Sequence, residues 1–250
     1  MRTVRVVLFI VLCFTVTCAW ADVAPRPSRR SPGPDNASRR SLQKPRAKVS
    51  MTNANVQVHI RSEQAQRTRN EGALIADVEG EFDMECTAVP KGGEDLDLVF
   101  PIYYTDEASP ECRRFSAGID GKPAEDVKTT TWSLTTARTK QVHTLWGYTW
   151  RLPGLKGGQK RQIAVRYSLV LPRVDGKARF IYVLRTGAGW NGPIGREVVN
   201  VTAEKGIRME VLTPTALEPE QKTDTSLSWS IVNAKPWEDI RLVIVPDAKP

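Results

Sequence analysis

The feature that most constrains the fold is a strict alternation of apolar and polar residues, which is clearest over residues 77–86. A period of two is typical of a β-strand with one buried face and one solvated face. The face predicted to be buried carries Val78, Phe82, Met84 and Cys86. The opposite face carries a carboxylate stripe of Asp77, Glu79, Glu81, Asp83 and Glu85. One strand of a half-exposed sheet is therefore expected here.

Similar patterns recur along the chain between turn signals, and no stretch shows convincing helical spacing over three turns. The strands that we expect cover residues 56–60, 77–86, 96–104, 115–119, 128–135, 142–152, 162–171, 178–184, 197–203, 207–212, 226–232 and 240–245. Asp120-Gly121 is a strong type I′ hairpin signal. The fold class is therefore all-β, an antiparallel β-sandwich-like domain that could comprise two β layers or subdomains with a sub-boundary near Lys205.

A second two-residue turn, Asp175-Gly176, allows a strand register to be predicted. It places Leu171 opposite Phe180 and, farther from the turn, Arg166 opposite Arg185. Like charges across a strand pair are unfavourable unless an anion lies between them. Two hypotheses account for this pair: the carboxylate stripe neutralises the arginines, or a bound anion does.

The N-terminus has the composition of an export signal followed by a linker. Residues 1–21 have an arginine-containing start, an apolar run and the small residues Ala19 and Ala21 before the expected cleavage site. The mature chain would start at Asp22, with a disordered linker of Pro, Ser and Arg over residues 22–48 and the all-β domain over residues 49–250. We therefore expect an exported protein, periplasmic or extracellular, with no transmembrane segment after cleavage.

The basic charge of the chain comes from these first residues. The whole chain has 36 Lys and Arg against 28 Asp and Glu, and residues 51–250 have 26 of each. The linker is either a soluble spacer or an electrostatic tether to an anionic surface through Arg29, Arg30, Arg39 and Arg40. It has no aromatic residues for stacking on bases, so specific nucleic-acid recognition is not expected.

Cysteine usage also suggests an exported protein. Cys13 and Cys18 lie in the expected signal peptide, which leaves Cys86 and Cys112 as a pair. An even pair in an exported chain predicts a disulfide, which would stabilise the fold by ~3.5 kcal/mol in the chain-entropy model. No Cys-x-x-Cys motif or His cluster indicates a metal or redox site.

The glycine-rich stretch of residues 180–195 begins as an apolar strand and continues as a loop with a single Trp190. Its glycines would let the loop fold back and place Trp190 over the end of the sheet. Arg185 and Arg196 bracket the loop. It is either a structural signature of the fold or a binding site, so the candidate ligand-binding residues are Arg185, Trp190, Arg196 and Arg166.

A second candidate binding surface is the aromatic ladder of Trp146, Tyr148 and Trp150. Alternation places the three rings on one strand face, where they would either pack in the core or, if exposed, stack against sugar rings. Burial is the expected outcome, because large aromatic side chains are normally buried and the other strand face is more polar.

No catalytic constellation stands out. His59 and His143 are isolated, there is no Gly-x-Ser-x-Gly, and no zinc signature is present. The glycine-rich loop lacks the Lys-Ser/Thr of a phosphate cradle. We therefore predict no catalytic residues, no metal ligands and no cofactor.

The spacing of residues from Trp150 onward resembles a bacterial family of exported proteins whose domain has no assigned function. The matching residues are Trp150-x-Leu152, Gly158-Gln159, Ile163-x-Val165-x-Tyr167, Tyr182-x-Leu184-x-Thr186-Gly187-x-x-Trp190-x-Gly192-x-Ile194 and Trp229-x-x-x-Asn233-x-x-Pro236 with Asp239-Ile240. The resemblance covers residues 49–246 and implies a β-rich, exported domain, with no activity or ligand to carry over.

The sequence thus predicts an exported, non-catalytic β-domain that acts as a binding or envelope-associated module. Its partner would be an unknown envelope protein or polymer. The alternative is a hydrolase of carbohydrate or cell-wall material that uses two carboxylates.

Overall fold

The computed structural model describes residues 24–26, 47–63, 73–89, 93–105, 109–135, 142–185, 190–214, 217–236 and 238–247. These residues form sixteen β-strands and no α-helix. The strands are β1 (Ala24–Arg26), β2 (Lys48–Ser62), β3 (Leu74–Ala88), β4 (Glu94–Tyr104), β5 (Glu111–Ile119), β6 (Lys122–Pro123), β7 (Lys128–Thr135), β8 (Val142–Leu155), β9 (Lys160–Leu171), β10 (Arg173–Val174), β11 (Lys177–Tyr182), β12 (Ile194–Ala203), β13 (Ile207–Thr213), β14 (Gln221–Lys222), β15 (Ser226–Ala234) and β16 (Ile240–Pro246).

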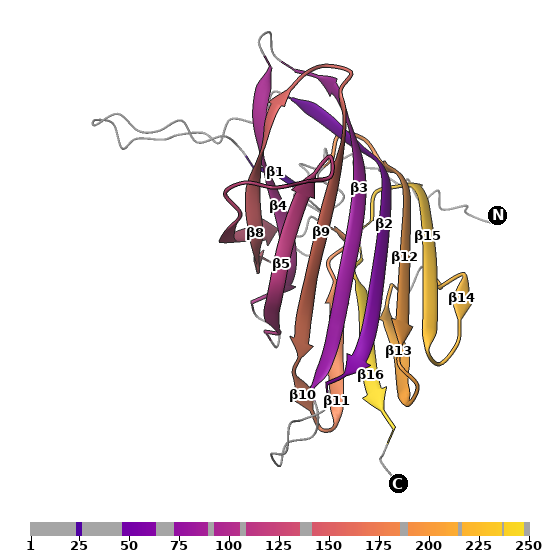
Figure 1. Cartoon of the computed structure of the whole chain (residues 1–250). Helices are drawn as coiled ribbons and strands as arrows, with labels where there is room; N and C mark the ends of the chain where they lie inside the picture. Colours follow the sequence, from indigo (N-terminus) through magenta and orange to yellow (C-terminus); the bar gives the residue numbers. More distant parts are fainter. Residues whose placement is uncertain are drawn as a thin grey trace, which may run out of the picture.

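The strands are arranged in one large and two small sheets. Sheet A has the order β1-β4-β8-β7, and sheet C has the order β10-β11-β16-β13. Sheet B has eight strands in the order β14-β15-β12-β2-β3-β9-β5-β6. In Figure 1, sheet B faces the viewer, sheet A lies beside and behind β5, and sheet C lies behind the lower part of sheet B. The expected all-β, sandwich-like class is confirmed.

The core lies between sheet B and the two small sheets, because the alternating strands turn their apolar faces inward. One cluster of buried side chains contains members of all three sheets, including Phe82 of β3, Trp150 of β8 and Phe180 of β11. β12 pairs with β2 in parallel, which places a strand from the C-terminal part of the domain beside one from the N-terminal part. The other strand pairings are antiparallel. Residues 204–206 connect β12 of sheet B to β13 of sheet C.

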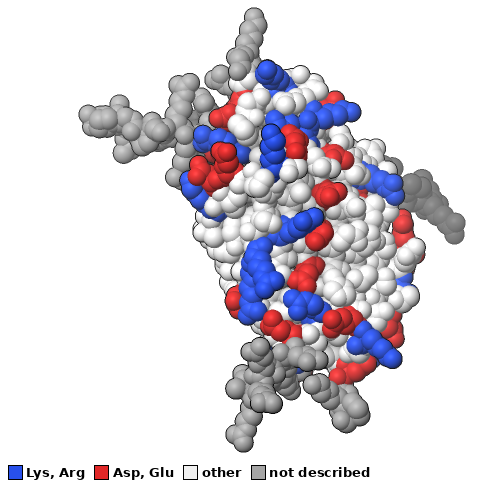
Figure 2. All heavy atoms as spheres, viewed as in Figure 1, with Lys and Arg blue, Asp and Glu red and all other residues white. Residues whose placement is uncertain are grey.

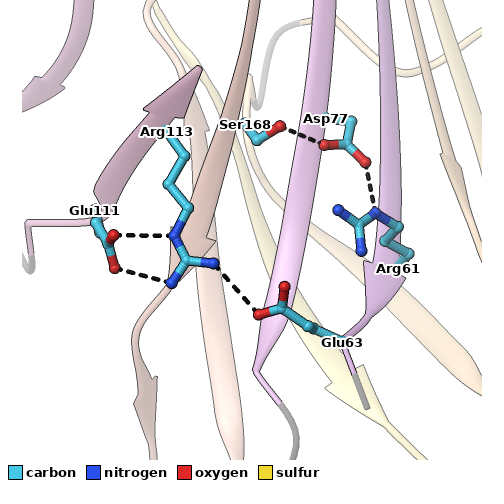
Figure 3. Close-up of polar contacts among 6 residues, drawn as sticks. All are labelled: Arg61, Glu63, Asp77, Glu111, Arg113 and Ser168. Carbon is cyan, nitrogen blue, oxygen red and sulfur yellow. Dashed lines mark hydrogen bonds and ion pairs between the residues drawn. The ribbon is translucent and has the colours of Figure 1, made fainter. Parts of the chain in front are cut away.

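The carboxylate stripe of β3 lies on the outer face of sheet B, as the alternation predicts, and charges of both signs interleave along the middle of this face (Figure 2). Asp77 accepts hydrogen bonds from Arg61 Nε at 2.6 Å and Ser168 Oγ at 2.5 Å (Figure 3). Arg113 binds Glu111 and Glu63 at the same end of the sheet. Among the described residues, no group of three His, Cys, Asp or Glu side chains is arranged to hold a metal ion.

The two predicted turns differ in the strands that they connect. Asp120 and Gly121 have positive φ values of 51° and 77° and join β5 to β6, so this hairpin is confirmed. Asp175-Gly176 also forms a turn, but only Arg173↔Ala178 and Val174↔Lys177 pair in the predicted register.

The longer hairpin predicted around Asp175-Gly176 is wrong. β9 pairs with β3 and β5 in sheet B, whereas β11 pairs with β16 in sheet C. The chain changes layer at Pro172, which has no amide hydrogen to continue a ladder. Arg166 therefore does not oppose Arg185; it lies opposite Glu79, with 3.6 Å between Nε and Oε1.

The predicted disulfide is also corrected, because Cys86 and Cys112 are both free thiols. Cys112 lies opposite Leu169, and Leu169 lies opposite Ala76 near the other end of β3 from Cys86. At a rise of about 3.4 Å per residue, this register separates the cysteines by roughly 34 Å. A disulfide requires Cα atoms within about 7 Å.

We therefore expect two reactive thiols per mature chain when the purified protein is unfolded without a reductant and treated with a thiol reagent. In the folded protein at neutral pH the reaction should be slow, because burial raises the pKa of Cys112 to about 11 and also raises the pKa of Cys86. If the unfolded chain showed no free thiols, the disulfide between Cys86 and Cys112 would be supported and the free thiols refuted.

Most of the N-terminal predictions lie outside the described residues, including the signal peptide and Arg29, Arg30, Arg39 and Arg40. Within the expected linker, residues 24–26 form β1 and pair with residues 97–99 of β4. In the described part of the chain, no helix has the length and apolar character needed to cross a membrane.

Candidate functional site

The candidate site is built on the face of sheet A that turns toward sheet B. Side chains that oppose each other in a ladder share a face. The pairings of β7, β8 and β4 therefore form two rows on this face, Thr129–Tyr148–Phe100 and Thr131–Trp146–Tyr103.

The aromatic ladder of β8 runs from the core toward solvent. Trp150 is 2% exposed, Tyr148 and Trp146 are half-buried, and Thr144 is exposed. Phe115, on β5 of sheet B, lies over Tyr148. The expected burial is thus found in full at Trp150 and only in part at the other two rings.

Four half-buried rings form what we call the aromatic platform: Tyr103, Trp146, Tyr148 and Phe115. Tyr103 and Trp146 are stacked, with ring centroids 5.2 Å apart and planes 19° apart. Trp146 meets Tyr148 edge to face at 5.2 Å, and Phe115 stacks on Tyr148 at 3.7 Å. These contacts hold each ring in place, so the platform is a preformed surface.

Three exposed hydroxyl side chains of β7 continue this face beyond the rings. We call Thr129, Thr131 and Ser133 the hydroxyl row. Each opposes a β8 residue of the same face: Tyr148, Trp146 and Thr144, respectively. A hydroxyl group can both donate and accept hydrogen bonds, so the row offers polar contacts next to the apolar rings.

Gly147 allows the two strands that carry the platform to approach each other closely. A Cβ atom at this position would overlap the carbonyl oxygen of Phe100. The ladder between β4 and β8 has a register shift between Pro101 and Tyr103. Beyond this shift, Tyr103 stacks on Trp146 at the platform.

The hydroxyl of Tyr148 is hydrogen-bonded to the thiol of Cys112, at the inner edge of the platform. Burial, together with the neighbouring Cys112, raises the pKa of Tyr148 to about 12. Both groups are therefore neutral at physiological pH. The platform is uncharged.

A buried polar joint supports the platform from behind. Tyr104, next to Tyr103, points to the opposite face and donates a hydrogen bond from Oη to Asp239 Oδ2 at 2.8 Å. Arg185 donates from Nε to the same oxygen at 2.9 Å and from its main-chain nitrogen to Asp239 Oδ1 at 3.0 Å. Arg185 Nη2 also donates to Tyr104 Oη at 2.7 Å.

The joint links sheet A to sheet C, because Tyr104 ends β4 and Asp239 precedes β16. Asp239 has a fully buried side chain, and the guanidinium groups of Arg185 and Arg241 lie 5.3 and 5.5 Å from the centre of the Tyr104 ring. Burial lowers the pKa of Arg185, but Asp239 and Tyr104 together more than compensate, and the pKa is raised overall. Burial also raises the pKa of Tyr104 above its usual range. The buried carboxylate of Asp239 is thus paired with Arg185 and, at 3.8 Å, with Arg241.

The four ligand-binding residues predicted from the sequence do not come together. Arg166 and Arg196 are exposed on the outer face of sheet B, on β9 and β12, with β3 and β2 between them. Trp190 is 2% exposed in the core, and Asn191 next to it donates a hydrogen bond to Val49 O at 2.9 Å. Arg185 belongs to the joint. Residues 186–189 of the glycine-rich loop lie outside the described residues.

Two acids are buried in the described part of the chain, and they lie in different environments. Asp239 is neutralised by arginine. Glu197 of β12 is 0% exposed, and its Oε1 accepts a hydrogen bond from Tyr182 Oη at 3.3 Å. Its Oε2 has no hydrogen-bond partner among the described residues. Burial raises the pKa of Glu197 to about 8.

The structure also has a cavity of about 550 Å³ at the β10–β11 turn. Its described lining residues are Pro172, Val174, Asp175, Lys177, Arg179 and Val243. Only Asp175 among them carries a carboxylate, so they do not supply the pair of acids that glycoside hydrolysis uses.

Sequence reasoning identified the ladder but missed its partners. Tyr103 and Phe115 reach the platform from other strands, and the hydroxyl row was not singled out. The alternation of Thr129, Thr131 and Ser133 within residues 128–135 was the available signal. The pairing of Arg185 with Asp239 and Tyr104 had no local signal.

No family model and no curated protein matches the chain. Among solved structures, the chain is similar to a protein of Legionella pneumophila provisionally named a nutrient-binding protein. The TM-score is 0.55 with 15% sequence identity, and the match covers 80% of this chain and 68% of that one. This similarity shows a shared fold.

Two peptidases match less well. An M1 zinc metallopeptidase of Deinococcus radiodurans has a TM-score of 0.39 and 11% identity over 80% of this chain and 42% of that one. An aminopeptidase N family protein of Idiomarina loihiensis has a TM-score of 0.37 and 9% identity over 76% and 29%. The chain spans less than half the length of each.

Proposed function

We propose that this chain is an exported, non-catalytic binding module of the cell envelope, and that the aromatic platform with its hydroxyl row binds a neutral polysaccharide. The observation that carries this proposal is the stack of half-buried Tyr103 and Trp146 directly beside three exposed hydroxyls. Export follows from the signal peptide expected at residues 1–21.

The chemistry of the platform favours sugars over other ligands. The C–H faces of sugar rings pack on aromatic faces, and their hydroxyls exchange hydrogen bonds with Ser and Thr. An anionic polymer would require cationic side chains, but the platform and the hydroxyl row contain none. A similar fold in a protein provisionally named for nutrient binding is consistent with a binding role.

The decisive variant is Trp146→Ala. We expect it to weaken binding to a neutral polysaccharide by at least about tenfold, which corresponds to about 1.4 kcal/mol for one lost stacking surface. Binding can be measured by affinity electrophoresis in gels that contain glucan, mannan or galactan, followed by titration calorimetry with the polymer that retards the protein.

Trp132→Ala is the matched control. Trp132 lies on the neighbouring strand but packs on the opposite face with Tyr104, Leu134, Leu145 and Val183. Trp132→Ala should lower the free energy of unfolding and leave the affinity for the polysaccharide unchanged. Retardation of the wild type in none of the gels, or equal loss of affinity in the two tryptophan variants, would refute the polysaccharide site.

A further inference from the structure

One edge of sheet A is suited to pairing with another strand. β7 is the terminal strand of this sheet, is eight residues long and pairs with β8 without a register shift. After Lys128 it contains no charged residue and no proline. A long, regular, uncharged edge of this kind is a template for strand addition, and natural proteins usually protect such edges.

The other edges of the described sheets carry such protection. β1, β6, β10 and β14 are only two or three residues long, and β1 and β6 contain Pro25 and Pro123. β13 carries Arg208 and Glu210 and has a bulge. Past their short neighbours, β4 contains Pro101, β5 contains Glu111 and Arg113, and β11 contains Arg179. The part of β15 past β14 is shorter than β7 and contains Asn233, which has a positive φ. Within the described residues, β7 from Thr129 to Thr135 is the longest edge without a charged residue or a proline.

We propose that two copies of this chain associate through their β7 strands, antiparallel and centred on Thr131, to form one continuous sheet. This register places Thr129 opposite Ser133 of the partner and Thr130 opposite Trp132 of the partner. Thr131 faces its own copy across the two-fold axis. Cross-strand pairs of Thr with Thr or Ser are favourable, and no like charges are brought together.

The pairing would also extend the candidate site. Because Thr131 lies in a row with Trp146 and Tyr103, the dimer would align this row with the same row of the partner. The two Trp146 side chains would then lie three strand spacings apart, about 14 Å. The partner thus contributes a second platform to one surface. The proposal of a dimer does not depend on the proposed polysaccharide binding. The role of the joined platforms as one binding surface does depend on it.

The first test measures the mass of the mature protein by sedimentation velocity over a range of concentrations. We expect a dimer for the wild type and for Thr131→Ser, and a monomer for Thr131→Lys, which places two ammonium groups opposite each other. Gln57→Lys adds the same charge to an exposed position on the outer face of sheet B and should remain dimeric. A monomeric wild type, or a dimer that survives Thr131→Lys, would overturn the proposal.

The second test is independent of any loss of folding. Residues opposite each other on a two-fold axis have Cα atoms about 4.5–5.5 Å apart, which is within the range of a disulfide. Thr131→Cys should therefore form a covalent dimer under mild oxidation, and Gln57→Cys should not. Absence of the cross-link in Thr131→Cys counts against this register. The polysaccharide affinity of Trp146→Ala is measured in a separate experiment from the oligomeric state of the Thr131 variants. The results therefore distinguish a wrong binding site from a wrong dimer.

Discussion

Replacing Asp239 with alanine is expected to lower the free energy of unfolding by about 3–5 kcal/mol, because the change leaves buried cationic groups without their counter-charge. Arg185 loses the acceptor of two hydrogen bonds, and Tyr104 loses the acceptor of its hydroxyl. The loss should appear in urea unfolding at neutral pH. Sheet A and sheet C meet at this joint, so the whole domain should be destabilised.

Two further variants separate this effect from a general effect of charge. Glu79→Ala removes an acid from an exposed pair with Arg166 and should change the free energy of unfolding by less than about 1 kcal/mol. Arg185→Gln, which removes the cation from the same joint, should destabilise the protein substantially. If the Asp239 and Glu79 variants were equally stable, Asp239 would not have the structural role assigned to it.

Replacing Glu197 with glutamine is expected to remove a large part of the pH dependence of stability. The folded pKa of Glu197 is raised to about 8 by burial, from an ordinary value of 4.5. Between these values the folded chain holds a proton that the unfolded chain has released. The free energy of unfolding therefore falls by about 1.4 kcal/mol per pH unit as the pH rises, and levels off above about pH 8.

The measurement is a series of urea unfolding curves for the wild type and Glu197→Gln between about pH 5 and pH 8. The difference between the two proteins isolates this carboxyl from the other titrating groups. We expect the difference to change steadily in favour of the variant as the pH rises. Parallel profiles would show that Glu197 is ionised in the folded protein or accessible to water.

Local patterns predicted the strands well. Residues 128–135 form β7 with the expected bounds, and the buried and exposed faces of β3 follow its alternation. The Asp120-Gly121 hairpin was also predictable, because a two-residue turn with positive φ at both positions selects the residues that adopt it. These features depend on neighbours within a few positions, which a sequence displays directly.

Long-range predictions were less successful, and the failures have a common cause. Asp175-Gly176 does form a turn, but the turn cannot determine whether its strands stay in one sheet, and they separate at Pro172. Two cysteines are the number that one disulfide needs, but the strand register places Cys86 and Cys112 too far apart to form it. For Arg185 the sequence left two hypotheses, the carboxylate stripe or a bound anion, and its partner in the structure is Asp239, fifty-four positions away.

The sequence by itself determined the strands, their buried faces and the all-β class, because alternation and turn chemistry act over a few residues. Only the tertiary structure decided which strands became neighbours, and with them the joint of Arg185 and Asp239 and the exposure of each ring in the β8 ladder. Trp146, Tyr148 and Trp150 have the same pattern in the chain. Their burial differs with the partners that other strands bring: Phe115 of β5 contacts Tyr148 and Trp150, whereas Trp146 contacts Tyr103 and Tyr148.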